Sequence, residues 1–329
     1  MGQSRSESKL MTAREAISRF AADGETVYVG YLMVPHALCH EVIRQRKRGL
    51  TLVGASLLQQ ATLLILAGCV GRIMTGYLGG ALRSKLLRDL MARGELKYED
   101  YSNQSQTLML MAGALGIPFI PTRTFLGSDF LSDKCVNHPH GWLRDKKYQL
   151  SQCPFTREKV VLLPALRPDL AVMAAQRADS QGNVQAWGAL GDAKWALWAA
   201  RKVVVSVEEV VPTEVIRRDP NRTIIPSFKV SAVVHEPFGA HPGAMSGYYD
   251  IDLAFNGRYG AWDSDEGASR QFLEEWVYGV KDRREYIERY VAKLGYEALR
   301  SIQASPPFPP IGTVDYAYSP NITAGVMRL

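Results

Sequence analysis

The stretch from Tyr98 to Asp129, YEDYSNQSQTLMLMAGALGIPFIPTRTFLGSD, decides the fold. Ser102 and Asn103 can each accept a hydrogen bond from a free backbone N–H, so we expect a helix to begin there. Nearly every residue from Leu108 to Leu115 is apolar, which predicts a helix buried on all sides. Gly116 favours the left-handed conformation that ends a helix.

A proline-bounded segment follows this helix. Residues 117–121, IPFIP, are too short and too rich in proline for a central strand, so we expect an extended piece. It leads into a polar loop with Thr122 and Arg123, which closes at Gly127-Ser128-Asp129. A polar helix start near an arginine loop fits an oxyanion or carboxylate site. A capped core helix beside a solvated loop explains the same residues, so the pattern alone leaves both open.

Strand and helix patterns alternate on the N-terminal side. The β-rich runs end in glycine, the helical runs have 3.6-residue spacing, and they cover residues 26–30, 50–54 and 72–76 (strands) and 11–20 and 36–47 (helices). This alternation is typical of a mostly parallel sheet with helices on both faces. Ligands bind beyond the carboxyl ends of such strands, where Gly79 and Gly80 also lie. Those two glycines suit close approach of a ligand or a plain tight turn.

The C-terminal half continues the pattern without a sequence repeat. Strands are predicted over residues 159–163, 170–174, 202–211 and 230–234. Asp192 is a candidate cap for a helix over residues 193–202, and residues 270–294 predict one long amphipathic helix. We expect a single domain over residues 11–304, a flexible tail at residues 1–10, and a proline-rich tail at residues 305–329 that wraps the surface or a partner.

Composition excludes several classes of protein. The chain has 329 residues, of which 47% are hydrophobic, enough for a full core. The longest apolar run, residues 61–70, is about half the length that crosses a bilayer, so no membrane segment is expected. The four cysteines form no C-x-x-C pair, which indicates neither a disulfide framework nor a zinc knuckle. The first ten residues do not resemble a signal peptide, so we expect a cytoplasmic protein.

The charge and the absence of common motifs argue against several further functions. The net charge of +6 includes basic runs that lack interleaved aromatic residues, so nucleic acid is not an expected partner. The sequence contains no G-x-G-x-x-G, P-loop, G-x-S-x-G or H-E-x-x-H motif. His138 and His140 flank a proline, but no acidic ligand accompanies them in a defined frame, and we predict no metal site.

Five segments in order resemble the α (A) subunits of two-subunit family I coenzyme A transferases of the glutaconate CoA-transferase type. That type has a Tyr-Thr/Ser-Asn opening, an Ala/Met-rich helix, an (I/V)-P-F-(I/M)-P-T-R run and a following L-G-(S/T)-D. The matching segments are residues 98–129, 23–30 with Pro35, 161–169, 176–184 and 236–242. Together they cover roughly residues 12–295, and their order is hard to obtain by chance.

The resemblance implies an open three-layer α/β/α sheet and a CoA thioester as substrate, without a tightly bound cofactor. It also implies a β subunit that carries the attacking glutamate, in an α2β2 assembly that acts on an acyl-CoA and a carboxylic acid. This chain then supplies the rest of the pocket. Asn103 and Ser102 are the predicted catalytic residues, with Asn103 a donor to the developing oxyanion. The predicted substrate-binding residues are Arg123, which can bind a carboxylate, with Thr122, Gly127, Ser128, Gly79, Gly80 and His241.

Two rival functions stay open at this point. A related branch contains ring-opening hydrolases of CoA thioesters from steroid degradation, with a catalytic glutamate near the start of the same helix. Asn103 stands there in this chain, with Glu99 and Asp100 one turn upstream. The other rival is a ligand-sensing module, since sensors and isomerases of sugar phosphates resemble this architecture, although no helix-turn-helix is evident.

Overall fold

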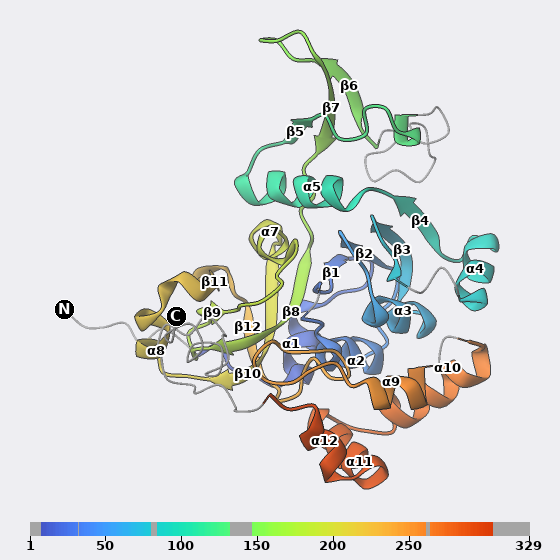
Figure 1. The fold of residues 1–329 in the computed structure, drawn as a ribbon, viewed down its shortest axis with the longest axis vertical. Helices are drawn as coiled ribbons and strands as arrows, with labels where there is room; N and C mark the ends of the chain where they lie inside the picture. The colour runs from blue at the N-terminus through green and yellow to red at the C-terminus, as the bar shows by residue number, and fades with distance from the viewer. Residues whose placement is uncertain (1–7, 32, 80–83, 132–146, 261–263, 305–329) are drawn as a thin grey trace, which may run out of the picture.

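The computed structural model describes residues 8–31, 33–79, 84–131, 147–260 and 264–304. Within them, nine strands form one sheet at the centre of the molecule (Figure 1). These strands are β1 (Thr26–Tyr28), β2 (Leu50–Gly54), β3 (Val70–Thr75), β4 (Lys97–Asp100), β8 (Leu170–Ala178), β9 (Val184–Gln185), β10 (Lys202–Val210), β11 (Thr223–Ile225) and β12 (Ala232–His235). Parallel pairing gives the order β4-β3-β2-β1-β8-β10-β12, and the short strands β9 and β11 are antiparallel. The predicted mostly parallel sheet is confirmed.

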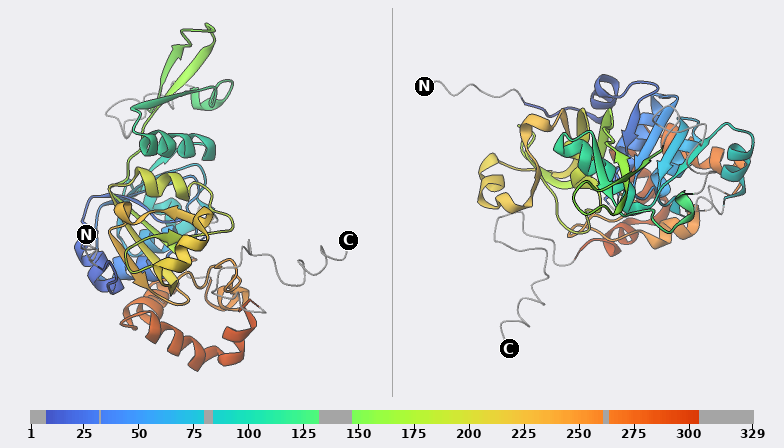
Figure 2. Two further views of the ribbon diagram at one scale, coloured as in Figure 1. Left: turned by 90° about the vertical axis from the view of Figure 1, so that its left-hand side faces the viewer. Right: turned by 90° about the horizontal axis from the view of Figure 1, so that it is seen from above.

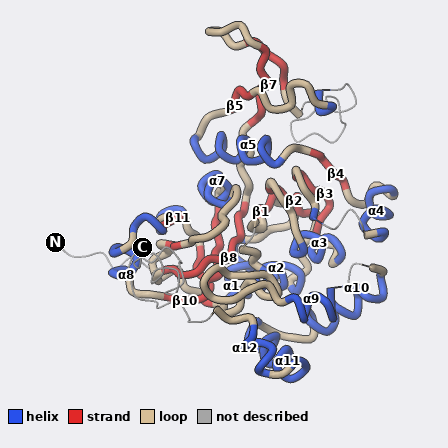
Figure 3. Tube along the Cα trace, viewed as in Figure 1, coloured by secondary structure: helices blue, strands red, loops and turns tan. Residues whose placement is uncertain are grey.

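Helices cover the sheet and surround its strands in the tube view (Figure 3). The α-helices of the described chain are α1 (Ala13–Phe20), α2 (His36–Arg44), α3 (Gln59–Leu66), α4 (Lys85–Ala92), α5 (Asn103–Leu115), α7 (Ala193–Ala199), α8 (Thr213–Arg218), α9 (Leu253–Tyr259), α10 (Glu266–Leu273), α11 (Arg283–Leu294) and α12 (Tyr296–Ser301). Alternate residues of each strand face opposite layers, as the pleat requires. Val27 and Leu52 pack with α1, α2 and α3, whereas Tyr28 and Val53 pack with α5 and α7. The predicted three-layer α/β/α architecture is therefore confirmed.

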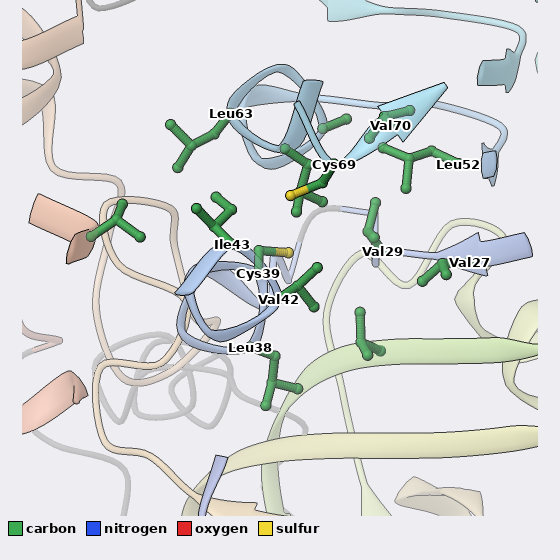
Figure 4. Packing of buried hydrophobic residues seen from close by; sticks show 14 of the residues in the cluster. Val27, Val29, Leu38, Cys39, Val42, Ile43, Leu52, Leu63, Cys69 and Val70 are labelled. Carbon is green, nitrogen blue, oxygen red and sulfur yellow. The ribbon is translucent and has the colours of Figure 1, made fainter. Parts of the chain in front are cut away.

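Two buried cysteines lie in the layer formed by α2 and α3. Cys39 and Cys69 are both free and sit among apolar side chains that include Ile43 and Val29 (Figure 4). Burial raises the pKa of the Cys39 thiol and raises the pKa of the Cys69 thiol to about 11. Both thiols are therefore protonated at neutral pH and act as small apolar core residues.

A second, smaller sheet projects from the body at the end opposite α11 and α12 (Figures 1 and 2). Its antiparallel strands β5 (Phe119–Thr122), β7 (Lys159–Pro164) and β6 (Gln149–Gln152) pair in that order. The proline-bounded segment is thus an edge strand, in agreement with its exclusion from a central place. Strand β7 does not join the main sheet, because it pairs with β5 and β6 before the chain returns to β8.

Helix α5 lies between the two sheets, and its predicted complete burial is wrong. Ser102 caps it by accepting a hydrogen bond from Ser105 N at 3.0 Å, and Gly116 ends it in the left-handed conformation, both as predicted. Met109 and Leu110 are fully buried, but Leu115 is 55% exposed. The helix packs on α7 and β2 on one side and on β5 and β7 of the small sheet on another, but its C-terminal end stays exposed, so the apolar run did not mean burial all round.

The predicted long helix over residues 270–294 is also divided. Helix α10 ends at Leu273, a π-helical turn η6 spans Glu274–Tyr278, and α11 begins at Arg283. Asp282 caps α11 by accepting a hydrogen bond from Glu285 N at 2.9 Å, which starts a new helix in a new direction. The predicted apolar side is nevertheless buried at Trp276 and Val277.

The expected flexible tail at residues 1–10 and the proline-rich tail at residues 305–329 stay predictions. Residues 1–7 and 305–329 lie outside the described residues, as do His138 and His140. Lys9 Nζ donates to Val230 O at 2.7 Å, and Leu10 bridges to Val233. Across the described ranges, no helix is both long and apolar enough to cross a bilayer.

Candidate active site

The order of the strands along the chain reverses direction across the sheet at β1. From β1 the sheet continues through β2, β3 and β4 on one side and through β8, β10 and β12 on the other. Ligands of open α/β sheets bind outside the carboxyl ends of the strands at such a point. A pocket of about 370 Å³ lies there, lined by Tyr31, Ala55, Asn103, Gln104, Thr107, Leu108, Gly191 and Asp192.

A larger groove of about 1240 Å³ runs between α1, α2 and α11. Its rim is charged, but Arg284 pairs with Glu288 at 2.9 Å and Arg44 pairs with Glu41 at 2.8 Å. Part of the charge on this rim is thus already paired, and the groove lies away from the reversal at β1. We assign the candidate active site to the smaller pocket for these reasons.

Asn103 is the first residue of α5 and faces this pocket. Its Nδ2 donates to Ser56 Oγ at 3.4 Å, and the second hydrogen of the amide NH2 group is available to another acceptor. A Cβ on Gly76 would lie 2.3 Å from Asn103 N, so only glycine allows the end of β3 to approach the helix start this closely. The backbone N–H groups of the first helical turn have no acceptor within the helix, so they add donors at the same place.

Ser102 supports this arrangement rather than lining the pocket. Its hydroxyl caps the helix, and Ser105 Oγ in turn accepts a hydrogen bond from Ser102 N at 3.0 Å. This reciprocal capping fixes the first turn of α5. Of the predicted site residues, the structure thus brings Asn103 into the pocket and Ser102 directly beside it.

Asp192 lines the pocket, although the sequence pattern predicted it as a helix cap. It precedes α7 as predicted, but its side chain does not cap that helix. Its Oδ1 accepts from Tyr28 OH at 2.9 Å and its Oδ2 accepts from Ala55 N at 2.7 Å. Burial raises the pKa of Asp192, although both hydrogen bonds oppose this shift by favouring the ionised carboxylate. Gly191 adopts φ +55°, and a Cβ on Gly191 would lie 2.4 Å from a ring carbon of Tyr31.

The predicted carboxylate-binding loop lies elsewhere, on the small sheet. Arg123 is 76% exposed and faces Glu158 across 3.8 Å. Thr122 Oγ1 accepts from Thr124 N at 3.0 Å, and Ser128 Oγ donates to Phe125 O at 2.7 Å. These contacts, with Gly127 at φ +78°, shape the loop itself, and none of these residues lines the pocket.

His241 and Gly79 are also separate from the pocket. His241 is fully buried between Asp252, at 3.1 Å from its Nε2, and Tyr286 OH, at 3.0 Å from its Nδ1. Burial lowers its pKa to about 4, so the ring is neutral near pH 7. Gly79 adopts φ +50°, and a Cβ there would lie 3.4 Å from Leu57 O, whereas Gly80 lies outside the described residues, so the choice between ligand approach and a tight turn stays open.

The upstream carboxyl groups do not reach the pocket. Glu99 and Asp100 lie on β4, where Tyr101 OH donates to Glu99 at 2.6 Å and Tyr98 OH donates to Asp100 at 2.9 Å. Among the described lining residues, Asp192 carries the one carboxyl group, and it already accepts two hydrogen bonds. The described lining of the pocket thus has hydrogen-bond donors for an oxyanion but no carboxylate free to attack.

Comparison with known proteins assigns this chain to a protein family. The family model for coenzyme A transferase matches residues 10–236. The chain belongs to the coenzyme A transferase family. It is 36% identical to the α (A) subunit of 3-oxoadipate CoA-transferase from Pseudomonas knackmussii over 288 residues, 84% of this chain and 96% of that one. It is 36% identical to an uncharacterized protein of Archaeoglobus fulgidus over 304 residues, 90% of this chain but only 65% of that protein's length.

The relationship extends to a solved structure. The α (A) subunit of glutaconate CoA-transferase from Acidaminococcus fermentans is 33% identical over 310 residues, 91% of this chain and 96% of that one. The crystal structure of that enzyme matches with a TM-score of 0.83 and 32% identity, over 91% of this chain and 96% of that chain. The chain is therefore a coenzyme A transferase chain of the α (A) type, as its resemblance implied.

Proposed function

We propose that this chain forms the pocket of a heteromeric coenzyme A transferase whose attacking glutamate is supplied by a sister β subunit. The complex moves CoA from an acyl-CoA to a free carboxylic acid, as a cytoplasmic α2β2 assembly. The observation that carries the proposal is the state of Asp192, which is buried and accepts hydrogen bonds at 2.9 and 2.7 Å. A carboxylate held by two donors is a poor nucleophile, so the attacking group must come from outside the described pocket.

The reaction is a covalent relay. The glutamate attacks the thioester carbonyl, the C–S bond breaks, and a mixed anhydride forms as CoA leaves as a thiolate. The thiolate attacks the glutamyl carbonyl, which releases the first acid as its carboxylate and leaves CoA bound to the glutamate as a thioester. A second carboxylate then reverses both steps, which yields the new acyl-CoA and restores the glutamate.

Each attack places negative charge on a carbonyl oxygen, and the donors at the start of α5 suit that charge. Asn103 Nδ2 uses one of its two hydrogens for the 3.4 Å hydrogen bond to Ser56 Oγ, so the other hydrogen can bond to the oxyanion. The backbone N–H of Gln104 lies in the same first turn, where no intrahelical acceptor exists. Donors fixed before the reaction stabilise such an oxyanion without reorganisation during it.

Exposed apolar side chains on and beside the small sheet support a partner. Leu115 at the end of α5, Phe119 on β5 and Leu150 on β6 are 55%, 46% and 53% exposed. The small sheet that carries the last two projects from the body (Figure 2). Exposed apolar surface on a projecting element is typical of protein–protein contacts. The roles of Arg123, Thr122, Gly127 and Ser128 toward a substrate carboxylate stay predictions, and they require the complete assembly to enclose this loop.

A reconstitution experiment tests the proposal. The tagged chain is expressed alone and together with the adjacent reading frame of its genome, and each preparation is given acetyl-CoA with a panel of acids that includes glutaconate and 3-oxoadipate. We expect new acyl-CoA only from the co-purified pair. Exchange by the isolated chain refutes the division of labour, and release of free CoA without exchange indicates that water is the acceptor.

A further inference from the structure

Asp192 has an unusual pair of hydrogen-bond partners for a residue at a helix start. The other aspartates directly before α-helices in the described part of the chain accept from their own helix, as Asp252 does from Phe255 N at 2.7 Å and Asp265 does from Ala268 N at 2.9 Å. Asp192 instead accepts from Tyr28, 164 positions away, and from Ala55, 137 positions away. Its carboxylate therefore joins the end of β1 to the end of β2.

The hydrogen bonds continue from Ala55 toward the start of α5. Ala55 O accepts from Gly76 N at 3.2 Å and from Thr75 Oγ1 at 3.3 Å, which ties the end of β2 to the end of β3. Gly76 lies against the backbone of Asn103, and Ser56, next to Ala55, accepts from Asn103 Nδ2. A continuous series of contacts thus leads from Asp192 through Ala55 and its neighbours to Asn103.

We propose that Asp192 is a positioning residue for the transfer reaction, whose carboxylate fixes the Ala55–Ser56 turn and thereby aims the Asn103 amide at the reacting carbonyl. This inference rests on the proposed function. Tyr28 is fully buried and Asp192 is 2% exposed, so neither partner can exchange its hydrogen bond for one to bulk water. The acceptor has to be a carboxylate, since it receives two donors at once on two different oxygens.

The expected kinetic effect follows from this role. In Asp192→Asn, one oxygen becomes an NH2 group, which cannot accept from Ala55 N if the remaining oxygen keeps Tyr28. The turn and the Asn103 amide then lose their fixed orientation, while the apolar pocket wall remains. Because orientation acts on the transition state more than on substrate binding, we expect kcat to fall and KM to change little.

The test uses the co-purified complex and a double-mutant cycle in the acetyl-CoA exchange assay. We expect Asp192→Asn to lower kcat about thirtyfold and Tyr28→Phe, which removes one of the two donors, to lower it about threefold. If Asp192 acts through Asn103, the double variant Asp192→Asn/Asn103→Ala loses no more activity than Asn103→Ala alone. Asp265→Asn is the matched control, an exposed helix-cap aspartate far from the pocket, and it leaves kcat unchanged.

The outcomes separate this inference from the function on which it rests. Absence of exchange by the wild-type complex overturns the proposed function. If the wild-type complex is active, three results overturn the positioning role. Asp192→Asn keeps the wild-type kcat, or it raises KM alone, or the double variant loses the product of the two single fold-losses in kcat. Thermal unfolding of each variant guards against loss of fold, and Tyr28→Phe, which keeps the ring in place, supplies the readout if Asp192→Asn is unstable.

Discussion

Gly76→Ala is the perturbation that tests the geometry of the candidate site most sharply. A Cβ at residue 76 would lie 2.3 Å from Asn103 N and 2.5 Å from the carbonyl carbon of Ser102, whereas ordinary contacts begin at 3.4 Å. Both neighbours are backbone atoms and cannot rotate away, so the first turn of α5 has to move by about 1 Å. A displacement of about 1 Å at a reacting centre costs roughly a hundredfold in rate.

The assay compares kcat of the co-purified complex with that of a variant on the same strand. In Gly71→Ala, the new Cβ finds its nearest neighbour at 3.9 Å, an ordinary contact, so kcat should stay within twofold of wild type. Overpacking at residue 76 should also lower the free energy of unfolding by about 1–3 kcal/mol, measured by urea denaturation. Wild-type turnover in Gly76→Ala would refute the claim that the start of α5 takes part in the reaction.

Three further predictions concern single residues. Asn103→Ala should lower kcat about a hundredfold if its amide donates to the oxyanion, and an unaltered kcat in exchange assays removes it from the site. Arg123→Ala should raise the KM for the acid about tenfold or more in the complete assembly, because enclosure of this loop would remove water from a pair between Arg123 and the substrate carboxylate. The exposed 3.8 Å ion pair with Glu158 contributes little, so an unchanged KM in the complex removes Arg123 from the substrate site. Burial raises the pKa of Glu208 from 4.5 to about 7, so protonation favours the folded state and the free energy of unfolding falls as pH rises from 4.5 to about 7, by about 3 kcal/mol. Glu208→Gln should remove that part of the slope in denaturation measured across this range, and an identical pH profile contradicts the assignment.

The parts of the fold that depend on short-range rules could be predicted from the sequence. Ser102 and Gly116 bound α5 as expected, because a cap requires only a side chain and its own helix. The β-rich runs that end in glycine predicted the strands β1, β2 and β3. The helices between these runs predicted their parallel arrangement. These features depend on residues that are close in sequence, so contacts with distant residues did not change them.

The features that depend on distant contacts could not be predicted in this way. The sequence pattern of β7 does not reveal its antiparallel partners, and the apolar side of α5 does not reveal which face lacks a neighbour within this chain. Asp192 shows the limit most clearly, because local rules make it a helix cap and only residues more than a hundred positions away make it part of the pocket. The sequence pattern thus placed Asn103 at the helix start that the structure brings to the pocket, its catalytic role stays a prediction, and the pattern gave no sign that Asp192 lines the same pocket.

The most direct test of the central claim locates the covalent intermediate. The co-purified complex is incubated with acetyl-CoA, quenched in acid, and digested, and mass spectrometry identifies the peptide that carries CoA as a thioester. We predict an adduct on a glutamate of the β subunit, with none on this chain. An adduct on a carboxyl group of this chain, such as Asp192 or Glu99, would contradict it.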